Sequence, residues 1–288
     1  MKPVKRVKPT IRVIAAALLA VTCLVGIVLA QQRGYGRRGY RGGNVPSELT
    51  DRRGVPDWEV DPAFKSDVFT FVRIRYNSWG GRGGGWLTDY PDSDLNFPFR
   101  LQQLTSMKVS PQPRVLDLTD DALFDYPFVY MIEPGGLTFS DEEVVALRRY
   151  LLNGGFLMVD DFWGEYEWDN FYQEIKRVFP DREPVELPLE HPIFHCVYDL
   201  KEKPQVPSIG HAQQYRGTEV TWERPDAREV HYKALFDDKG RMMSIICHNT
   251  DLGDGWEREG EDEYYFREFS EKKAYPMGIN IVFYAMTH

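Results

Sequence analysis

The chain has 288 residues, and 42% of them are hydrophobic, which is enough for one domain with a sizeable core. Its formal net charge is −9, but the charge is unevenly distributed. Residues 1–43 hold nine basic side chains and no acidic one, which leaves 26 basic against 44 acidic side chains in the remainder. A body this acidic is not expected to bind nucleic acid or anionic lipid through bulk electrostatics.

The amino-terminal segment, residues 1–30, has the pattern of an export signal. A basic leader that includes Lys2 and Arg12 precedes an apolar run of 18 residues from Val13 to Ala30. The small residues at its end suit a signal peptidase, and its length is at the lower limit for a membrane-spanning helix. A cleaved signal peptide and a retained single anchor both remain open, and we prefer cleavage. Either way we expect a periplasmic or otherwise extracytoplasmic protein, secreted or anchored by this segment.

Residues 31–66 are expected to form a flexible linker. Within them, residues 33–43 form a low-complexity tract of arginine, glycine and tyrosine that lacks the apolar content of a folded core. Such tracts can bind nucleic acid, but an exported chain would rarely meet any. We therefore interpret the tract as a tether to a single folded domain at residues 67–288.

The domain is expected to begin with a strand at residues 67–76, which are rich in β-branched and aromatic side chains. The glycine-rich stretch after it, residues 80–85, has neither the dinucleotide-binding spacing nor the Gly-Lys-Ser/Thr of a P-loop, so a flexible loop is expected. A helix is predicted over residues 97–107, with Asp94 or Asn96 as its N-cap.

A strand–helix–strand unit follows. Residues 127–132 form a short apolar strand that ends at Glu133. Ser140 and Glu143 form a capping box at the start of the next helix, and Asn153-Gly154-Gly155 ends it. A buried strand then ends at Asp160 and Asp161, and a further helix is expected at residues 168–179. Such a right-handed βαβ unit requires a parallel sheet.

The last third of the chain has a different pattern. Strand-like runs at residues 229–236 and 241–247 are joined by a turn sequence, which predicts an antiparallel hairpin. A helix at residues 274–286 closes the chain. Cys196 and Cys247 are expected to be free buried thiols, although an oxidising compartment leaves a disulfide open.

Several separated blocks of the body carry a family resemblance. They are Phe71–Tyr76, Trp86–Pro91, Asp94–Phe97, Leu101–Ser106, Gly154–Asp161, His191–Phe194, Asn249–Trp256 and Gly278–Asn280. With these blocks the chain resembles the bacterial family known as domain of unknown function 4159. The resemblance covers most of the body, and it implies no established activity.

The order of elements is more distantly similar to class I glutamine amidotransferase-like folds, especially the trehalose-utilisation-like branch. There, too, a helix feeds a Gly-Gly strand, and a hairpin precedes the last helix. The similarity implies an α/β fold, a flavodoxin-like three-layer sandwich with a mostly parallel central sheet plus a C-terminal hairpin and helix. Amidotransferases carry a nucleophilic cysteine on the turn after that strand, where this chain has Asp160-Asp161-Phe162-Trp163-Gly164. The lack of cysteine or serine there argues against amide hydrolysis by a thiolate.

The candidate site lies where the parallel strands end, because ligands of open α/β sheets collect beyond the carboxyl ends of the strands. The candidate ligand-binding residues are Tyr76, Asn77, Trp86, Asp89, Asp94, Glu133, Asp160, Asp161, Trp163 and His248. We expect the strand-end residues to line one concave surface that Asp89 or Asp94 closes. Clustered carboxylates can coordinate a hard cation or split their pKa values for acid–base work, and tryptophans beside them suit stacking on a sugar. The alternative is that these acids cap helices and pair with Arg73, Arg75 and Arg100.

Two other motifs are interpreted as structural. His191 and His195 are four residues apart, but Pro192 between them makes a helical metal pair implausible. Residues 251–257 resemble a calcium loop, yet they lack the EF-hand spacing and its terminal bidentate glutamate, so a solvated surface loop is expected, and a cation there is kept as a minor alternative.

These observations favour a non-catalytic exported module that binds a small ligand, such as a saccharide, or an envelope protein. No catalytic residue and no organic cofactor is predicted, a divalent cation is left open, and membrane contact is expected only through the amino-terminal segment. The alternative function is a carboxylate- or metal-dependent hydrolase that acts on an envelope or saccharide substrate.

Overall fold

The computed structural model describes residues 48–64, 67–79 and 85–288. The predictions for the leader at residues 1–30, for the Arg-Gly-Tyr tract and for residues 80–84 of the glycine-rich stretch therefore lie outside the described residues. Among the described helices, none combines the length and the apolar character that a membrane crossing requires.

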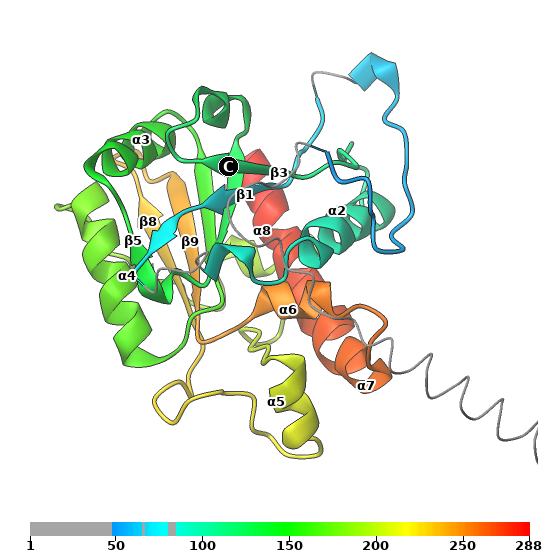
Figure 1. Cartoon of the computed structure of the whole chain (residues 1–288). Helices are drawn as coiled ribbons and strands as arrows, with labels where there is room; N and C mark the ends of the chain where they lie inside the picture. The colour runs from blue at the N-terminus through cyan, green and yellow to red at the C-terminus, as the bar shows by residue number, and fades with distance from the viewer. Residues whose placement is uncertain (1–47, 65–66, 80–84) are drawn as a thin grey trace, which may run out of the picture. The chain divides into compact units, whose positions relative to one another are not determined.

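Within the described residues, a seven-stranded sheet organises the domain, in the order β3-β1-β4-β6-β9-β8-β7 (Figure 1). The strands from β3 to β9 in this order are mutually parallel, and β8 and β7 are antiparallel to their neighbours. In sheet order the strands are β3 (Arg114–Asp117), β1 (Val72–Arg75), β4 (Phe128–Ile132), β6 (Phe156–Asp160), β9 (Met242–His248), β8 (His231–Phe236) and β7 (Val185–Glu186). A separate pair joins β2 (Asn77–Ser78) to β5 (Leu137–Thr138). The predicted α/β class with a mostly parallel sheet is confirmed.

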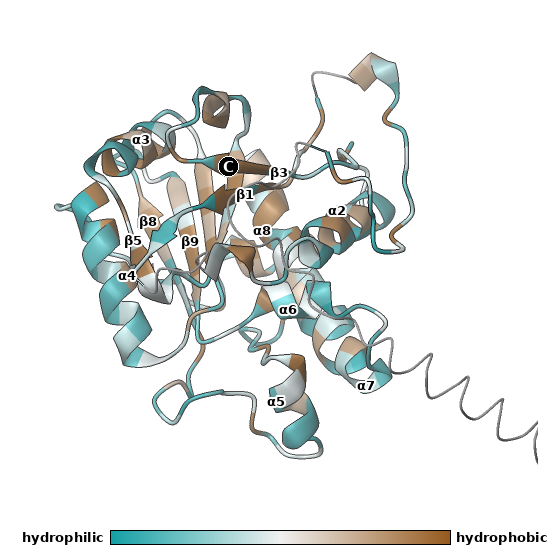
Figure 2. Ribbon diagram, viewed as in Figure 1, coloured by the Kyte–Doolittle hydropathy of each residue, from teal (hydrophilic) through white to brown (hydrophobic). Residues whose placement is uncertain are grey.

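The central strands are buried on both faces, because helices cover both sides of the sheet. In β4, Phe128 and Tyr130 pack into one hydrophobic cluster, whereas Val129 and Met131 pack into the other. The first cluster includes residues from α2 (Asp92–Leu104), α6 (Leu252–Glu257) and α8 (Tyr275–Thr287), and the second includes residues from α3 (Asp141–Leu152) and α4 (Gly164–Val178). Figure 2 shows the apolar strands between helices whose outer faces are hydrophilic.

The strand–helix–strand unit forms as predicted. β4 and β6 pair in parallel from Phe128↔Phe156 to Ile132↔Asp160. Between them α3 starts after Ser140, whose side chain accepts from the Glu143 N–H while the Glu143 carboxylate accepts from the Ser140 N–H. This register places Asp160 at the carboxyl end of a buried central strand.

Two predicted helices begin earlier than expected. α2 starts at Asp92 after Pro91, without a side-chain cap, because the Asp94 carboxylate is bound to Arg73 instead. α4 starts at Gly164, directly after the strand-end turn. The remaining helical elements are α5 (Ile209–Gln214), α7 (Glu263–Tyr265), a π-helical segment (Phe266–Ala274) and 3-10 turns η1 (Pro62–Phe64), η2 (Gly85–Leu87), η3 (Asp121–Asp125), η4 (Pro134–Gly136) and η5 (Pro192–Phe194).

The carboxyl-terminal hairpin is confirmed, with β8 and β9 paired from His231↔His248. Both cysteines of the described part are free, as expected, but only Cys247 is buried, whereas Cys196 is exposed. Within the stretch expected to be linker, Leu49 is buried and the Trp58 Nε1–H donates to the Val109 carbonyl at 2.8 Å. These residues therefore contact the domain.

Candidate functional site

Three neighbouring strands end in the same unusual backbone conformation. The residues that directly follow β4, β6 and β9 are Glu133, Asp161 and Asn249, with φ values of 48°, 57° and 62°. For a residue other than glycine this left-handed conformation costs about 1 kcal/mol, and such residues cluster at functional sites. Backbone bonds between the strand ends hold it in place, since Glu133 N–H donates to Asp160 O and Asn249 N–H donates to Phe162 O.

Asp160 is completely buried at the end of β6. Its Oδ2 accepts from the Tyr130 hydroxyl at 3.1 Å and from the Gly253 N–H at 3.0 Å. Its Oδ1 has no hydrogen-bond partner within the described ranges. Burial raises the pKa of Asp160 to about 7, although these hydrogen bonds oppose the shift. The carboxyl group therefore changes its charge near neutral pH.

Asp161 occupies the turn between β6 and α4. Its Oδ1 accepts from the Trp163 indole N–H at 3.1 Å. Burial raises the pKa of Asp161 well above its ordinary value, and the charges of Glu133 and Asp160 raise it further. The turn therefore holds a carboxylate that has a strained backbone conformation and is repelled by neighbouring carboxylates.

The segment that was expected to be a solvated surface loop is instead buried. Residues 252–257 form α6 with Asp251 as its N-cap; Leu252 and Trp256 are fully buried, and Asp251 and Asp254 are about 95% buried. The four-residue spacing of Leu252 and Trp256 was the available signal for a helix with an apolar face. The surface-loop expectation is wrong because the apolar face of α6 packs on α2 and β4. This packing also buries Asp251 and Asp254.

The close approach of α6 depends on Gly253. A Cβ atom at this position would lie 2.6 Å from the Asp89 Oδ2 and 2.8 Å from the Tyr130 hydroxyl. Because only glycine leaves this space, the α6 backbone and the Asp89 carboxylate can meet. Burial raises the pKa of Asp251, with the charges of Asp161 and Asp254 adding to the effect, and it raises the pKa of Glu257 to about 7.

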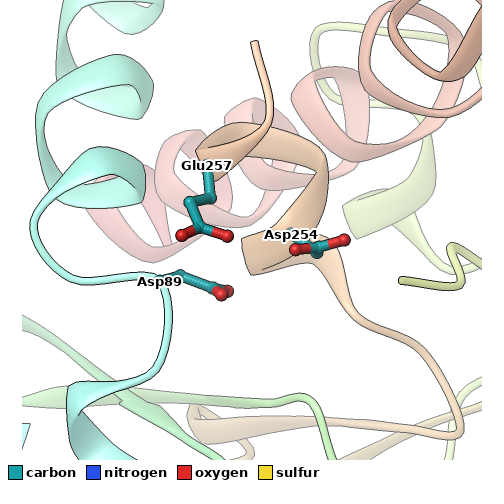
Figure 3. Close-up of side chains that lie close together, drawn as sticks. All are labelled: Asp89, Asp254 and Glu257. Carbon is teal, nitrogen blue, oxygen red and sulfur yellow. The ribbon is translucent and has the colours of Figure 1, made fainter. Parts of the chain in front are cut away.

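Asp89 lies in the loop before α2, with φ of 62° and only 7% of its surface exposed. Its Oδ2 has no hydrogen-bond partner in the part of the chain that the structure describes. Burial raises the pKa of Asp89 well above its ordinary value, and the charges of Glu257 and Asp254 add to this. Figure 3 shows the three carboxylates facing one another.

Asp94 has a different role from Asp89. Arg73 and Asp94 are both fully buried, and the guanidinium donates from Nε to Oδ1 at 3.0 Å and from a terminal nitrogen to Oδ2 at 2.5 Å. The other terminal nitrogen donates to the Trp86 and Thr88 carbonyls. The expectation that Asp94 closes the site is therefore not supported, since its carboxylate is a structural partner of Arg73, as the alternative interpretation held.

The aromatic candidates are internal. Trp86 and Trp163 are only 3% and 4% exposed, so neither presents an open ring face to solvent. The Tyr76 hydroxyl is buried and donates to the Ile132 carbonyl at 2.7 Å, which ties β1 to the end of β4. Asn77 is exposed in β2, where it pairs with Thr138.

His248 ends β9 and is also buried. Its Nε2 lies 3.1 Å from the Gly164 carbonyl, and its ring packs against Phe162 and Trp168. Burial lowers the pKa of His248 to about 4, so the imidazole is neutral at physiological pH. Of the other candidate histidines, His191 accepts from the Ile193 N–H and His195 pairs with Asp199, which confirms their structural interpretation.

A cavity of about 480 Å³ opens beside η3 and α3, where Leu118, Phe124, Val145 and Arg149 contribute to its lining. None of the candidate residues lines this cavity.

Fold and site together define an α/β protein with a mostly parallel sheet and a cluster of buried carboxylates at its carboxyl edge. The chain belongs to the family described as domain of unknown function (DUF4159), whose model matches residues 70–286. This match confirms the family resemblance, while the similarity to amidotransferase-like folds stays a prediction. A search of curated proteins finds no match to the chain.

Proposed function

We propose that the protein is a non-catalytic binding module that takes a positively charged ligand at the acidic edge of its parallel sheet. One observation carries this proposal, namely an excess of buried carboxylates over basic side chains at that edge. The buried acids are Asp89, Asp160, Asp161, Asp251 and Asp254. Burying several like charges together is unfavourable unless protons or a cation compensate them.

The mutual repulsion of these acids supports a cationic ligand. Charges of neighbouring carboxylates contribute to the raised pKa values of Asp89, Asp161 and Asp251. Bound positive charge would relieve this repulsion, and its binding would therefore stabilise the folded state. A neutral saccharide would not do so, and the burial of both candidate tryptophans leaves it without a stacking surface.

Thermal unfolding of the full chain after chelation tests this function. Divalent metal chlorides and spermidine serve as cationic probes, and a neutral disaccharide at equal concentration serves as the control. We expect at least one cationic probe to raise the melting temperature by several degrees in a saturable manner, and Asp161→Asn to reduce the effect. Asparagine tolerates the positive φ of this position, so the variant keeps the turn. Equal, non-saturable responses to all probes would refute the proposal.

A hydrolase is the second candidate, and the position of Asp161 favours it. A strained residue on the turn between a strand and a helix is where α/β hydrolases expose their nucleophile. The test is turnover of p-nitrophenyl phosphate, acetate and glycosides with divalent ions present. Turnover that Asp161→Asn abolishes while cation binding persists would favour the enzyme over the binding module.

Export to the extracytoplasmic space, by a cleaved signal or a retained anchor, is proposed from the basic leader and apolar run of residues 1–30. Cell fractionation combined with mass measurement of the mature amino terminus tests it. A mature chain that starts at Gln31 indicates cleavage, and a membrane-bound intact chain indicates an anchor. An intact chain in the cytosol would contradict export altogether.

A further inference from the structure

Three carboxylates from two separate elements meet inside the acidic edge. Asp89 comes from the loop before α2, and Asp254 and Glu257 come from successive positions on one side of α6. One ligand oxygen from each residue lies within 4.8 Å of those of the other two. Figure 3 shows the three side chains close together, with Asp89 on the loop and the other two on α6.

The Asp89 carboxylate is the second, independent observation. Its side chain is more than nine-tenths buried, and its Oδ2 accepts no hydrogen bond from any residue that the structure describes. The close approach of this oxygen to Gly253 aims it at α6. A buried carboxylate oxygen is strongly unfavourable when neither a donor nor a cation compensates it.

The partners of the other two acids do not supply that compensation. Asp254 accepts from the Ile209 N–H at 2.5 Å and from Arg258 Nε at 3.0 Å. Arg258 Nε also lies 2.6 Å from the Glu257 Oε2, in an ion pair without hydrogen-bond alignment. The same guanidinium also pairs with Glu261, so one positive charge is shared among three carboxylates. With all three acids ionised, the group keeps an excess of two negative charges, which a divalent cation would neutralise.

The spacing and the type of ligand atom fit a hard cation. Two oxygens on opposite sides of Ca²⁺ are about 4.8 Å apart and those around Mg²⁺ about 4.2 Å apart, given their usual metal–oxygen distances. The three oxygens all lie within the wider limit. The absence of sulfur and imidazole among the three disfavours a thiophilic ion.

We propose that Asp89, Asp254 and Glu257 bind a hard divalent cation such as Mg²⁺, Mn²⁺ or Ca²⁺, with water completing the coordination sphere. This inference rests on the proposed function, since it names the class of positively charged ligand. The ion bridges the loop before α2 to α6, so its binding couples the two elements that enclose the site.

The experiment uses the full chain, stripped with a chelator and dialysed. Calorimetric titration with MgCl₂, MnCl₂ and CaCl₂, at constant ionic strength set by KCl, measures affinity and stoichiometry. Metal analysis after gel filtration measures retention. We expect one equivalent of at least one ion to bind, together with a saturable rise in melting temperature.

Matched variants separate ligation from structure. Asp89→Asn and Glu257→Gln should weaken binding at least tenfold, while the metal-free melting temperature does not fall, because each removes repulsion. Asp92→Asn at the start of α2 and Glu263→Gln at the start of α7 are the controls, since both acids lie outside the three and pair elsewhere or are exposed. Both controls should bind like the unmodified chain.

Each outcome bears on the inference. Absence of saturable binding by all three ions overturns it, and so does unchanged affinity in both Asp89→Asn and Glu257→Gln. If spermidine binds and is lost in these variants while the metals do not bind, the cationic module stands and the metal assignment is wrong. If neither class of probe binds, both proposals fall.

Discussion

Asp89 and Asp94 lie five residues apart at the start of α2, and both are buried, yet they have opposite environments. Asp94 receives the Arg73 guanidinium and the Ser93 hydroxyl, so its charge is compensated within the chain. Asp89 faces Asp254 and Glu257, and one of its oxygens has no partner among the described residues. Two buried acids of one segment can therefore differ completely in charge compensation, and only an uncompensated one favours a bound cation or proton.

The largest loss of stability is expected at Asp94, whose buried charge is fully compensated by Arg73. Asp94→Asn leaves the fully buried Arg73 without its counter-charge, and breaking such a pair destabilises a protein by about 3–5 kcal/mol. Urea unfolding of the variant measures the loss. Asp92→Asn, two residues away, is the control and should change stability by less than about 0.5 kcal/mol. A loss below about 1 kcal/mol for Asp94→Asn would contradict the claim that Arg73 depends on Asp94 for its counter-charge.

Burial also opposes the charged form of the base His248, so its pKa is lowered where the pKa values of the buried acids are raised. The folded-state pKa of His248 is about 4, below its ordinary value of 6.5, because of burial first. His231 and Lys233 lower it further, and the Gly164 carbonyl and Asp226 oppose the shift. Since the unfolded chain takes up the proton first, the stabilisation is complete above pH 6.5 and declines as the pH falls toward 4.

Between pH 7.5 and pH 5, His248 should therefore remove about 2 kcal/mol of stability. Unfolding free energies of the unmodified chain and of His248→Phe at both pH values measure this contribution by difference. Phenylalanine keeps the packing on Phe162 and Trp168. The exposed His288→Gln is the control, and an identical pH slope in all three chains would contradict the assignment.

A smaller and opposite effect is expected at Asp89. Without divalent ions, Asp89→Asn removes a carboxylate that Glu257 and Asp254 repel, and so should stabilise the protein by about 1 kcal/mol. Adding saturating divalent ion should reverse the order of the two melting temperatures, because only the unmodified chain gains from binding. A destabilised metal-free variant would show that Asp89 is structural, like Asp94.

The smallest loss of stability is expected for Arg75 and Asp117, an ion pair that remains in contact with water. Arg75 and Asp117 form a bidentate pair across β1 and β3 with about a third of each side chain exposed. Solvent screening reduces such pairs to about 0.5 kcal/mol or less. Asp117→Asn in denaturant titrations at low and at 1 M salt should show a small loss that salt removes. A loss near that of Asp94→Asn would mean that burial is not what separates the two pairs.

Local sequence signals predicted the centre of the fold well. The Ser140–Glu143 capping box and the apolar run before Asp160 are short-range patterns, and both formed as expected. The position of Asp160 and Asp161 at the sheet edge followed from the parallel topology alone. The capping box and the strand were predictable because each depends on neighbours within a few residues, and the edge position then follows from the right-handed crossover between parallel strands.

The partners of the candidate acids were not predictable in the same way. Asp94 and Asp89 stand in similar sequence surroundings, and only the fold brings Arg73 to one and α6 to the other. The acidic run around Asp254 suggested solvent exposure, because composition does not show which face a six-residue helix buries. Long-range packing decided both cases.

The position of β9 has a consequence for how the chain is made. β9 lies in the middle of the sheet, where Leu157 of β6 pairs with Ser244, although the two segments are far apart in the chain. During synthesis β6 therefore keeps an open edge until residues 242–248 have left the ribosome, which is a long time for a buried apolar strand to remain unpaired. Chains that stop before this point would present that edge to one another, and such edges template aggregation.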